Sequence, residues 1–564
     1  MILPMKKYIL TLACLVALGA QAQNVYEIEQ VGGLDLNGTA RFVGMGGAMN
    51  ALGADLSTMG GNPAAIGLYR RSDVSLSFSS QTQKDAVAYG GQGKTRASFD
   101  QAGLVYALKT GNDKLRYFNF GFNYQKSRNL KQFIGTPYLS LNGMSLTHQL
   151  AQHLYFSNPT LADYYNYNSV ISNGAEDAGL IGSDVDANGN YTGDVLALHG
   201  DRYGFDRANW GYVGEYDINM AANIKDRVYV GMTIGVYQVK AQSKKYYEEY
   251  FQEKALVPGS PEMSYDINEV SDLRGSGFDM KFGAVVRPIE ENPFRFGLAF
   301  HTPRILTLSQ SKALEFRTSQ YVPFDPNPDA AQTLRTGTYD YNIRTPWRLQ
   351  VSAATTVSNW LALDAEYEVA MYNKTGIKYP TRYNYYDGSS SITNSMKDEF
   401  VASEVGYCLR PQHTVRIGAE ARFANNWYAR LGYNFVSAPF KKDAFLNYSQ
   451  PLDGDIATNN NGDVTWVEPS FRSSYNLTST DYTNLGATNR LSFGLGWHTK
   501  HFYIDAAYML QSQSAKTYAF SEVDYDISQP NEFGTYDLAS GNLLPAYSTQ
   551  LVRHSALFTL GVKF

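Results

Sequence analysis

The residues best suited to bind a metal ion occupy alternate positions in one short segment. These residues are Asp184, Asp186 and Asn188, and the last of them is followed directly by a glycine. This is the spacing of the oxygen ligands and the sharp turn in the first half of a calcium loop. The twelfth position, where such a loop carries a bidentate glutamate, is Val195. A structural calcium ion that stiffens the segment is therefore one interpretation, and a plain polar turn is the other.

The histidines suggest two other chemistries. His148 and His153 lie in one predicted helix, and imidazole is an axial ligand of haem. Five residues apart, they do not share a helix face well. A hydrolase would need a nucleophile beside an activating base, and the scattered histidines show no local signature of one. We therefore expect no enzyme and no cofactor, with a hydrolase and a haem-binding receptor as the alternatives.

Composition narrows the class of protein. The 564 residues carry a formal net charge of -5 with the two signs well mixed, so nothing indicates a nucleic-acid partner. The chain has 43 tyrosines, 29 phenylalanines and 49 glycines, yet its mean hydropathy is slightly polar. Transmembrane β-barrels have this profile, because only every second strand residue meets lipid and aromatic residues gather at the two interfaces.

The N-terminus has the features of an export signal. A basic pair, Lys6 and Lys7, precedes an apolar run over 8–18 and a small-x-small cleavage site at 20–22. Residues 1–22 are therefore predicted to be a secretory signal peptide. No later stretch approaches the roughly 20 apolar residues that a spanning helix needs, so a helical membrane protein is excluded.

Alternation with period 2 is the main structural signal. Phe278, Met280 and Phe282 fall on one face of a predicted strand, and Asp279 and Lys281 fall on the other. About fourteen segments alternate in this way, each close to the ten residues of a tilted spanning strand. They run near 72–82, 98–108, 115–126, 212–224, 227–240, 276–287, 293–302, 346–357, 359–370, 412–423, 426–436, 489–499, 501–511 and 552–564.

The connections between these segments alternate between short and long. The short ones include 110–114, 225–226, 288–293, 358–359, 425–426 and 499–500. The long ones include 127–211, 241–275, 303–345, 371–411, 437–488 and 512–551. Turns at one rim and long loops at the other indicate an all-β fold, an antiparallel transmembrane barrel of about 14 strands in the outer membrane of a Gram-negative-type bacterium. An even number of strands places both termini in the periplasm.

The segment before the first strand has a different character. Residues 23–71 are rich in glycine and lack sustained alternation. A barrel of this width would leak, so we expect 23–71 to plug the lumen as a hatch and 72–564 to form the barrel. Inward charges would hold the hatch or pair with one another along a hydrated wall. They are Asp279, Lys281, Arg295, Arg348, Asp364, Glu366, Arg416, Glu420, Arg422, Arg430 and Asp505.

Two stretches of the hatch carry a recognisable motif. They are Gly38-Thr39-Ala40-Arg41-Phe42-Val43-Gly44-Met45-Gly46-Gly47-Ala48 and Gly61-Asn62-Pro63-Ala64-Ala65. This part of the chain resembles the N-terminal hatch of the long-chain fatty-acid and aromatic-hydrocarbon transporters, the FadL and toluene-X family. The similarity continues at Gly275-x-Gly277, Arg295-Phe296-Gly297-Leu298 and His413-Thr414-Val415-Arg416-Ile417-Gly418, and the barrel of that family also has fourteen strands.

The resemblance implies passive transport of small hydrophobic molecules, such as long-chain fatty acids, similar lipids or aromatics. Extracellular loops would capture the ligand, the hatch would rearrange, and a kink in the third strand would release the ligand sideways into the bilayer. The hatch residues implied in gating are Arg41, Gly44, Gly46, Gly47, Asn62, Pro63 and Ala64. Gly121 is the candidate for the kink, although a glycine in a barrel strand also relieves crowding.

Apolar residues in the first long loop are candidates for ligand capture. Leu146, Leu150 and Leu154 form one stripe of a predicted helix, and Tyr164 and Tyr165 lie in a second. Both helices could equally pack on each other and close the barrel mouth.

The remaining expectations concern partners. They are a hydrophobic small molecule, outer-membrane lipid and lipopolysaccharide, and the barrel-assembly machinery, which would read the last strand ending at Phe564. We expect a monomer. A non-selective polar porin is a weaker alternative, because the hatch argues against it.

Overall fold

The computed structural model describes most of the chain. The described residues are 25–148, 150, 170–185, 191–196, 199–251, 262–318, 332–358, 360–384, 390–397, 399–442, 444, 456–458, 464–466, 482–520 and 544–564. The predicted signal peptide lies outside them. No helix among these residues is long and apolar enough to cross a bilayer.

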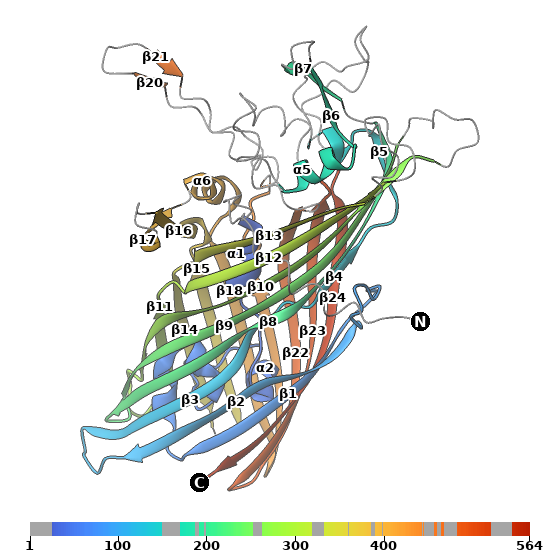
Figure 1. Cartoon of the computed structure of the whole chain (residues 1–564). Coiled ribbons are helices and arrows are strands. Elements are labelled where there is room, and N and C mark those ends of the chain that lie inside the picture. Colours follow the sequence, from blue (N-terminus) through green and yellow to red (C-terminus); the bar gives the residue numbers. More distant parts are fainter. Residues whose placement is uncertain are drawn as a thin grey trace, which may run out of the picture.

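Fourteen antiparallel strands within the described residues form one closed wall (Figure 1). The wall strands are β1 (Asp73–Gln83), β2 (Thr95–Lys109), β3 (Leu115–Asn129), β8 (Gly200–Ile224), β9 (Val228–Phe251), β10 (Ser264–Val286), β11 (Arg295–His301), β14 (Arg348–Val357), β15 (Leu361–Ala370), β18 (Gln412–Ala424), β19 (Trp427–Val436), β22 (Tyr482–His498), β23 (Phe502–Tyr518) and β24 (Tyr547–Lys563). Each strand pairs with the next, and β1 pairs with both β2 and β24, which closes the ring. The predicted fold class and all fourteen predicted strands are confirmed.

Several wall strands are longer than predicted. β9 and β10 stay paired from Val228 to Tyr250, so most of the predicted loop 241–275 is strand. The alternation continues there with Tyr247 and Glu249 buried, but the outward residues are polar instead of apolar. The prediction was wrong because it tied strand length to the thickness of the membrane, whereas these strands continue past the apolar band.

Further strands and helices lie beyond the wall, toward the end of the barrel with the long connections (Figure 1). β12 (Ile305–Thr318) and β13 (Gln332–Arg344) follow β11 and precede β14, so much of the predicted loop 303–345 is strand as well. The others are β4 (Gln132–Gly135), β5 (Leu139–Gly143), β6 (Gly182–Val185), β7 (Tyr191–Leu196), β16 (Gly376–Asn384), β17 (Ser390–Lys397), β20 (Ile456–Thr458), β21 (Val464–Trp466), α5 (Val170–Asp177), α6 (Glu399–Cys408) and the 3₁₀ helix η3 (Tyr372–Lys374).

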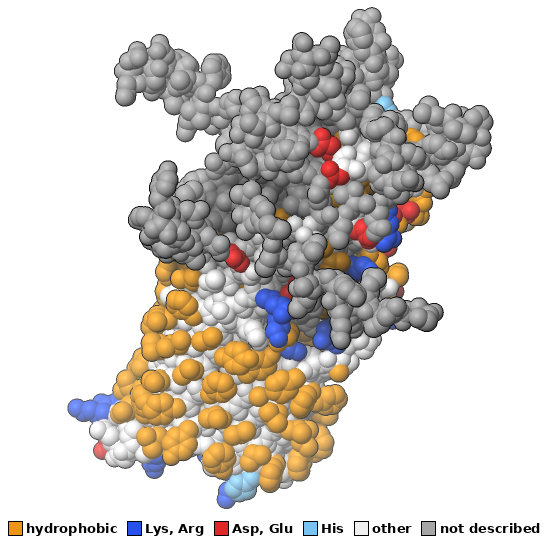
Figure 2. All heavy atoms as spheres, viewed as in Figure 1, with side chains coloured by type: hydrophobic (Ala, Val, Ile, Leu, Met, Phe, Trp, Pro, Cys, Tyr) orange, Lys and Arg blue, Asp and Glu red, His pale blue; other side chains and the backbone are white. Residues whose placement is uncertain are grey.

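The outer face of the wall carries a continuous apolar band (Figure 2). Leu76, Ile504 and Leu560 are neighbours across three strands, and each is about half exposed. Above the band the outward side chains become polar, as at Lys240 and Arg274. An apolar surface of this extent on a closed barrel is covered only by lipid, so the protein is a transmembrane β-barrel of the outer-membrane type.

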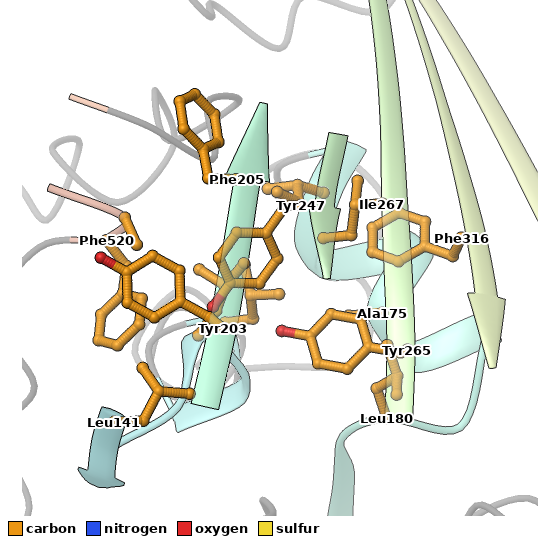
Figure 3. Close-up of a cluster of buried hydrophobic side chains, with 14 of the residues drawn as sticks. Leu141, Ala175, Leu180, Tyr203, Phe205, Tyr247, Tyr265, Ile267, Phe316 and Phe520 are labelled. Atoms are coloured by element: carbon orange, nitrogen blue, oxygen red, sulfur yellow. The ribbon is translucent and has the colours of Figure 1, made fainter. Parts of the chain in front are cut away.

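A cluster of buried apolar side chains lies at the end of the barrel with the long connections (Figure 3). Tyr203 and Tyr247 from β8 and β9 belong to the same buried cluster as Phe520, which follows β23. Leu146 and Leu150, two of the candidates for ligand capture, are also in this cluster and are 1% exposed. Their side chains therefore close the lumen in this structure and do not form an open apolar face.

A charge in the apolar band should destabilise the barrel. We expect Leu560→Arg to lower the free energy of unfolding in lipid vesicles by about 2–4 kcal/mol, because the guanidinium would face hydrocarbon. Leu560→Ala is the matched control, since it removes the side chain without adding a charge. Unfolding in guanidinium chloride, followed by tryptophan fluorescence, measures both variants, and equal losses would contradict a lipid-facing position.

Candidate functional site

The hatch lies inside the barrel. Its helices are α1 (Val25–Gly32), α2 (Ala40–Gly44) and the 3₁₀ helices η1 (Leu56–Gly60) and η2 (Pro63–Leu68). η2 packs on β8, β9 and β10, whereas α2 packs on β22 and β23, so the hatch contacts several arcs of the inner wall. Most of its side chains are buried, and the segment therefore occupies the lumen (Figure 1).

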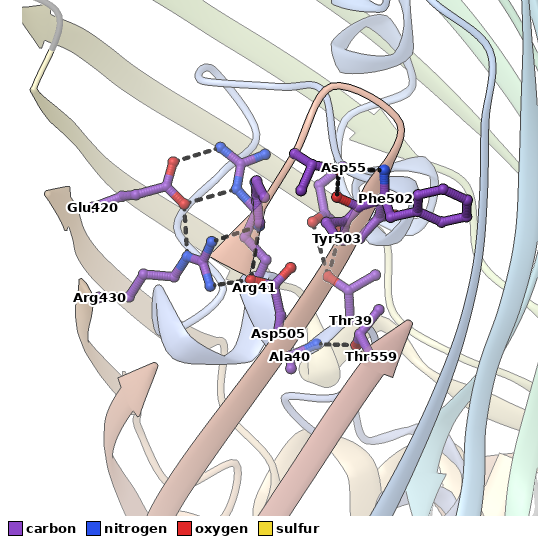
Figure 4. A network of polar contacts seen from close by, with 12 residues as sticks. Thr39, Ala40, Arg41, Asp55, Glu420, Arg430, Phe502, Tyr503, Asp505 and Thr559 are labelled. Carbon is purple, nitrogen blue, oxygen red and sulfur yellow. Dashed lines mark hydrogen bonds and ion pairs between the residues drawn. The ribbon is translucent and has the colours of Figure 1, made fainter. Parts of the chain in front are cut away.

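Arg41 anchors the hatch to the wall through a buried charge network (Figure 4). Its Nε and Nη2 atoms donate to the two carboxylate oxygens of Glu420 at 2.9 and 2.7 Å, and its Nη1 donates to the carbonyl of Ala54 at 3.0 Å. Glu420 also accepts from Arg430, which in turn pairs with Asp505, both at 2.6 Å. The bidentate geometry fixes the direction of the Arg41 side chain.

Two wall carboxylates accept hydrogen bonds from four consecutive hatch amides. Glu366 accepts from the backbone N–H groups of Met49 and Asn50 at 2.8 and 2.7 Å. Asp364 accepts from the next two amides, those of residues 51 and 52, at 3.2 and 2.9 Å. These amides are buried and have no sheet partner, so the carboxylates satisfy donors that would otherwise cost free energy.

The Asn62-Pro63-Ala64 motif starts η2. The Asn62 side chain accepts from the Ala64 amide at 3.1 Å and donates to the carbonyl of Ala284 in β10 at 3.3 Å. Pro63 occupies the first helical position, where a missing N–H costs nothing. Its carbonyl accepts from Asn219 at 3.2 Å. The motif is therefore both a helix cap and a contact with the wall.

Glycines allow the hatch backbone to touch the wall. Gly46 and Gly47 have positive φ angles of 66° and 80°, which glycine adopts without strain. A Cβ atom added at Gly432 would collide with the Gly46 backbone, and one added at Gly44 would lie 3.1 Å from the Cα of Gly494. The gating candidates Arg41, Gly44, Gly46, Gly47, Asn62, Pro63 and Ala64 thus all lie in or against the inner wall.

The inward charges divide into two groups. Arg295, Asp364, Glu366 and Glu420 bond directly to the hatch. Others pair within the wall. These are Asp279 with Lys281, Arg348 and Arg416 with Glu368, and Arg430 with Asp505. Arg422 belongs to neither group. It keeps the inward register of Glu420 on β18, but it lies opposite Tyr428 near the end of the strand, where its side chain is exposed.

The wall has a break between β2 and β3. Their pairing ends at Gln101 and Gln125. β2 has a bulge next to Gln101, and β3 has one after Lys126, where each strand bends away from the other. Phe99 lies just beyond the last residue of β2 that pairs with β3, and its ring stacks on that of Tyr124 of β3 at 5.7 Å, at the edge of the break.

The hatch fills this break. The Asn37 side chain donates to Asp100 of β2 at 3.3 Å and to the carbonyl of Lys126 of β3 at 3.1 Å. The Asp35 amide donates to the Ser127 carbonyl at 2.9 Å. Residues 35–37 therefore take the place that β2 leaves beside β3.

Gly121, the candidate for the kink, lies in the paired part of β3. Pairing is regular through it on both sides, opposite Val105 and Asn219. A Cβ atom added at Gly121 would meet the side chain of Met59. The glycine therefore makes room for the hatch, and the strand bends at the bulge after Lys126.

A polar cavity of about 170 Å³ lies between α1 and the strands around it. Arg128 of β3 donates to Glu29 of α1 at 2.8 Å, and Arg490 of β22 donates to Asp35 at 3.3 Å. Arg553 of β24 also lines the cavity. The sequence reasoning missed these residues. Arg490 and Arg553 follow the inward alternation of their strands, whereas Arg128 has the outward parity of β3 and follows the bulge after Lys126.

The other candidate sites are largely outside the described residues. Leu154, Tyr164, Tyr165 and His153 are among the undescribed residues, as are Asp186 and Asn188. The backbone of Asp184 belongs to β6. His148 is buried with its ring 5.7 Å from that of His199. Within the described residues, no group of three His, Cys, Asp or Glu side chains could hold a metal ion, and the calcium and haem interpretations stay predictions.

These features define a transmembrane barrel closed by its own N-terminal segment. No family model and no curated protein matches the chain. Among solved structures, the toluene transporter TbuX of Ralstonia pickettii is 13% identical, with 94% of this chain and 99% of that chain covered and a TM-score of 0.45. A FadL homologue of Pseudomonas aeruginosa is 12% identical over the same shares, with a TM-score of 0.46. The CymD monoaromatic hydrocarbon channel is 11% identical, again over the same shares, with a TM-score of 0.45.

These structures are of the kind that the hatch motif resembles. The closed ring of paired strands defines the fold of this chain.

Loss of the Arg41 anchor should loosen the hatch. We expect Arg41→Met to lower the free energy of unfolding by about 3 kcal/mol, since it breaks a largely buried pair, and to raise ion conductance in planar bilayers. Arg70→Met is the control, because it removes the exposed pair with Asp226 at the rim and should cost less than about 1 kcal/mol. Unchanged conductance in the Arg41 variant would contradict the anchoring role.

The close approach at Gly432 can be tested separately. We expect Gly432→Ala to lower the stability of the folded barrel by about 1–3 kcal/mol, because the new methyl group meets the Gly46 backbone. Gly376→Ala is the control, since nothing lies within 4 Å of a Cβ atom added there. Thermal unfolding followed by gel mobility measures both, and equal midpoints would show that the hatch does not press on β19.

Proposed function

We propose that this barrel passively transfers small hydrophobic molecules across the outer membrane and releases them sideways into the bilayer. One observation carries the proposal. The wall is interrupted between β2 and β3, and the hatch itself fills the interruption. Movement of residues 35–37 would therefore open a lateral exit without breaking any pairing of the wall strands.

The place of the break indicates the kind of cargo. Phe99 and Tyr124 at its edge, with Phe78 next to Phe99 at 5.4 Å, form an aromatic group among the exposed apolar side chains of the wall. Aromatic residues concentrate where a bilayer meets water. An exit at this level leads into the lipid, so only a molecule that is stable in hydrocarbon would leave by it.

The seal is suited to reversible opening. Asn37 and Asp35 hold β2 and β3 through a few side-chain and backbone hydrogen bonds. Each such bond contributes about 1 kcal/mol net, so the seal would cost much less to open than a full strand ladder. The bulges keep both strands apart in either state.

The hatch also reaches the extracellular elements. Tyr26 of α1 stacks on Phe440 at 5.2 Å, and its hydroxyl donates to Asn484 at 3.0 Å. α1 also contacts α6, which lies in the loop before β18. A ligand that moved these loops would therefore act directly on the N-terminal end of the hatch.

The same proposal covers the location and the partners of the barrel. Both termini lie in the periplasm, the extracellular loops capture the ligand, and the barrel is a monomer. The barrel-assembly machinery inserts it through the strand ending at Phe564, and the inserted barrel contacts lipopolysaccharide.

A disulfide between the hatch and the wall tests the mechanism. A Cβ atom added at Gly297 would lie 3.6 Å from the Cβ of Ala51, within the range of disulfides. It requires that the Ser352 hydroxyl rotate away and that the Asn62 amide, 3.0 Å from the new Cβ, shift slightly. We expect oxidised Ala51→Cys/Gly297→Cys barrel to lose most uptake of radiolabelled dodecanol by cells that produce it. Reduction with dithiothreitol should restore the uptake.

The single variants Ala51→Cys and Gly297→Cys are the controls, and oxidation should not affect them. The native Cys408 does not interfere, because it is 1% exposed and burial, with Glu404 nearby, raises the pKa of its thiol. If the oxidised double variant transported dodecanol at the wild-type rate, hatch rearrangement would be ruled out.

A further inference from the structure

Basic side chains gather on the outer wall just above the apolar band (Figure 2). Lys240 of β9 pairs across the sheet with Tyr212 of β8 on one side and with Arg274 of β10 on the other. Lys126 of β3 places its Nζ atom 5.2 Å from the centre of the Tyr212 ring. All four side chains have the parity of the lipid-facing residues of their strands, such as Val236 on β9. The three cations therefore form one row around Tyr212 on the outer face.

The protein itself only partly balances the charge of this basic row. Arg274 bonds to Asp272 of its own strand at 2.8 Å and keeps a side chain that is 71% exposed. Lys126 donates to the hydroxyl of Ser98 at 2.5 Å. Lys240 makes no hydrogen bond and no ion pair with its side chain among the described residues, and it lies directly opposite Arg274. Like charges in that position destabilise a sheet, so an anionic partner would relieve the row.

The height of the basic row matches the head groups of a lipid leaflet. On each strand the cation stands one or two outward positions above a lipid-facing side chain, and outward positions are about 7 Å apart along a strand. The residues below it are Tyr124 on β3, Gln238 and Val236 on β9, and Ser276 and Phe278 on β10. Head groups lie directly beyond the acyl chains that cover the band, so they meet the row.

Other parts of the wall meet the interface in a different way. The Tyr367 hydroxyl lies 2.7 Å from Nδ1 of His413, on β15 and β18. The Tyr508 hydroxyl lies 2.6 Å from Nδ1 of His554, on β23 and β24. Aromatic pairs of this kind suit any bilayer interface. From β3 to β10 the wall instead presents cations, which select for an anionic head group.

The width of the basic row indicates the kind of head group. Three strand spacings separate β3 from β10, which corresponds to roughly 14 Å. A single phosphate group contacts only one part of such a row. A head group with two phosphates on either side of sugar rings reaches both ends, and its acyl chains cover the apolar band below.

We propose that Lys126, Lys240 and Arg274 bind the phosphates of lipopolysaccharide, through its bisphosphorylated lipid A part, on the outer wall. The inference rests on the proposed function, which places this end of the barrel outside the cell, and it assigns the surface that meets the lipid. The ammonium and guanidinium groups donate charge-assisted hydrogen bonds to the phosphates.

The lipid site adjoins the break in the wall. The Lys126 carbonyl accepts from Asn37 of the hatch at 3.1 Å, while its ammonium group reaches Ser98 of β2 on the other side of the break. Ser98 in turn donates to Asp100 at 2.6 Å, and Asp100 accepts from Asn37. Lys126 therefore belongs both to the basic row and to the edge of the exit. A cargo molecule that leaves sideways would enter the acyl chains of the lipid held there.

Native mass spectrometry of the folded barrel in a neutral detergent tests the proposal. The probes are bisphosphorylated lipid A, monophosphorylated lipid A and phosphatidylglycerol. We expect the wild type to bind bisphosphorylated lipid A at least about tenfold more tightly than phosphatidylglycerol, with the monophosphorylated form between them. A rise in salt from about 50 to 500 mM should weaken this binding, because the cations are exposed and are screened.

Four variants locate the site. Lys126→Gln/Lys240→Gln should weaken the binding of bisphosphorylated lipid A by at least about fivefold, and Lys126→Arg/Lys240→Arg should retain it. Lys109→Gln/Lys114→Gln is the matched control, since it removes two exposed lysines from β2 and β3 at the opposite rim. Lys240→Glu removes no bond within the protein, so it should weaken binding while the barrel still migrates as a folded species on unheated gels.

Three results would overturn the assignment. The first is a wild-type barrel that binds phosphatidylglycerol as tightly as bisphosphorylated lipid A, which needs no variant to fold. The second is unchanged binding of lipid A by the Lys126→Gln/Lys240→Gln variant. The third is an equal loss in the control variant, which would show that only the total charge matters. Normal uptake of dodecanol alongside any of these results leaves the transport function standing. Lipid A binding as expected in a wild-type barrel that takes up no dodecanol would remove the transport function alone.

Discussion

The need to satisfy buried backbone amides controls how the hatch sits in the barrel. Strands satisfy their own amides through the ladder, but an irregular segment in a closed lumen must find acceptors on the wall. Glu366 and Asp364 accept from the four amides of residues 49–52. These carboxylates of β15 fix the hatch at one depth, and Glu420 of the neighbouring strand β18 holds it through Arg41. Glycines such as Gly432 bring the two backbones close enough for these contacts.

The same physics explains why the wall opens where it does. Bulges beside Gln101 and after Lys126 remove β2 and β3 from each other's ladder, which leaves backbone groups that need a partner. Asn37 supplies that partner from the hatch. A plug that completes the wall couples its own position to the closure of the barrel, and this coupling is what a lateral release mechanism requires.

The lumen combines two environments. The apolar cluster around Tyr203 and Phe205 fills the end with the long connections, whereas the cavity beside α1 is lined mainly by polar side chains. A molecule that passes through the barrel would therefore meet both kinds of surface.

The sequence by itself determined the barrel, because alternation depends only on neighbouring residues and is visible in segments such as 276–287. The alternation of short and long connections and the hatch motif at Asn62 could also be read directly from the sequence. Strand ends were predicted poorly, since polar outward residues beyond the membrane still alternate, as they do after Lys240. Only the tertiary structure decided which wall carboxylates meet the hatch and where the pairing of β2 and β3 ends. Both depend on contacts between residues far apart in the chain, such as Asn50 and Glu366. Such contacts leave no pattern along the sequence.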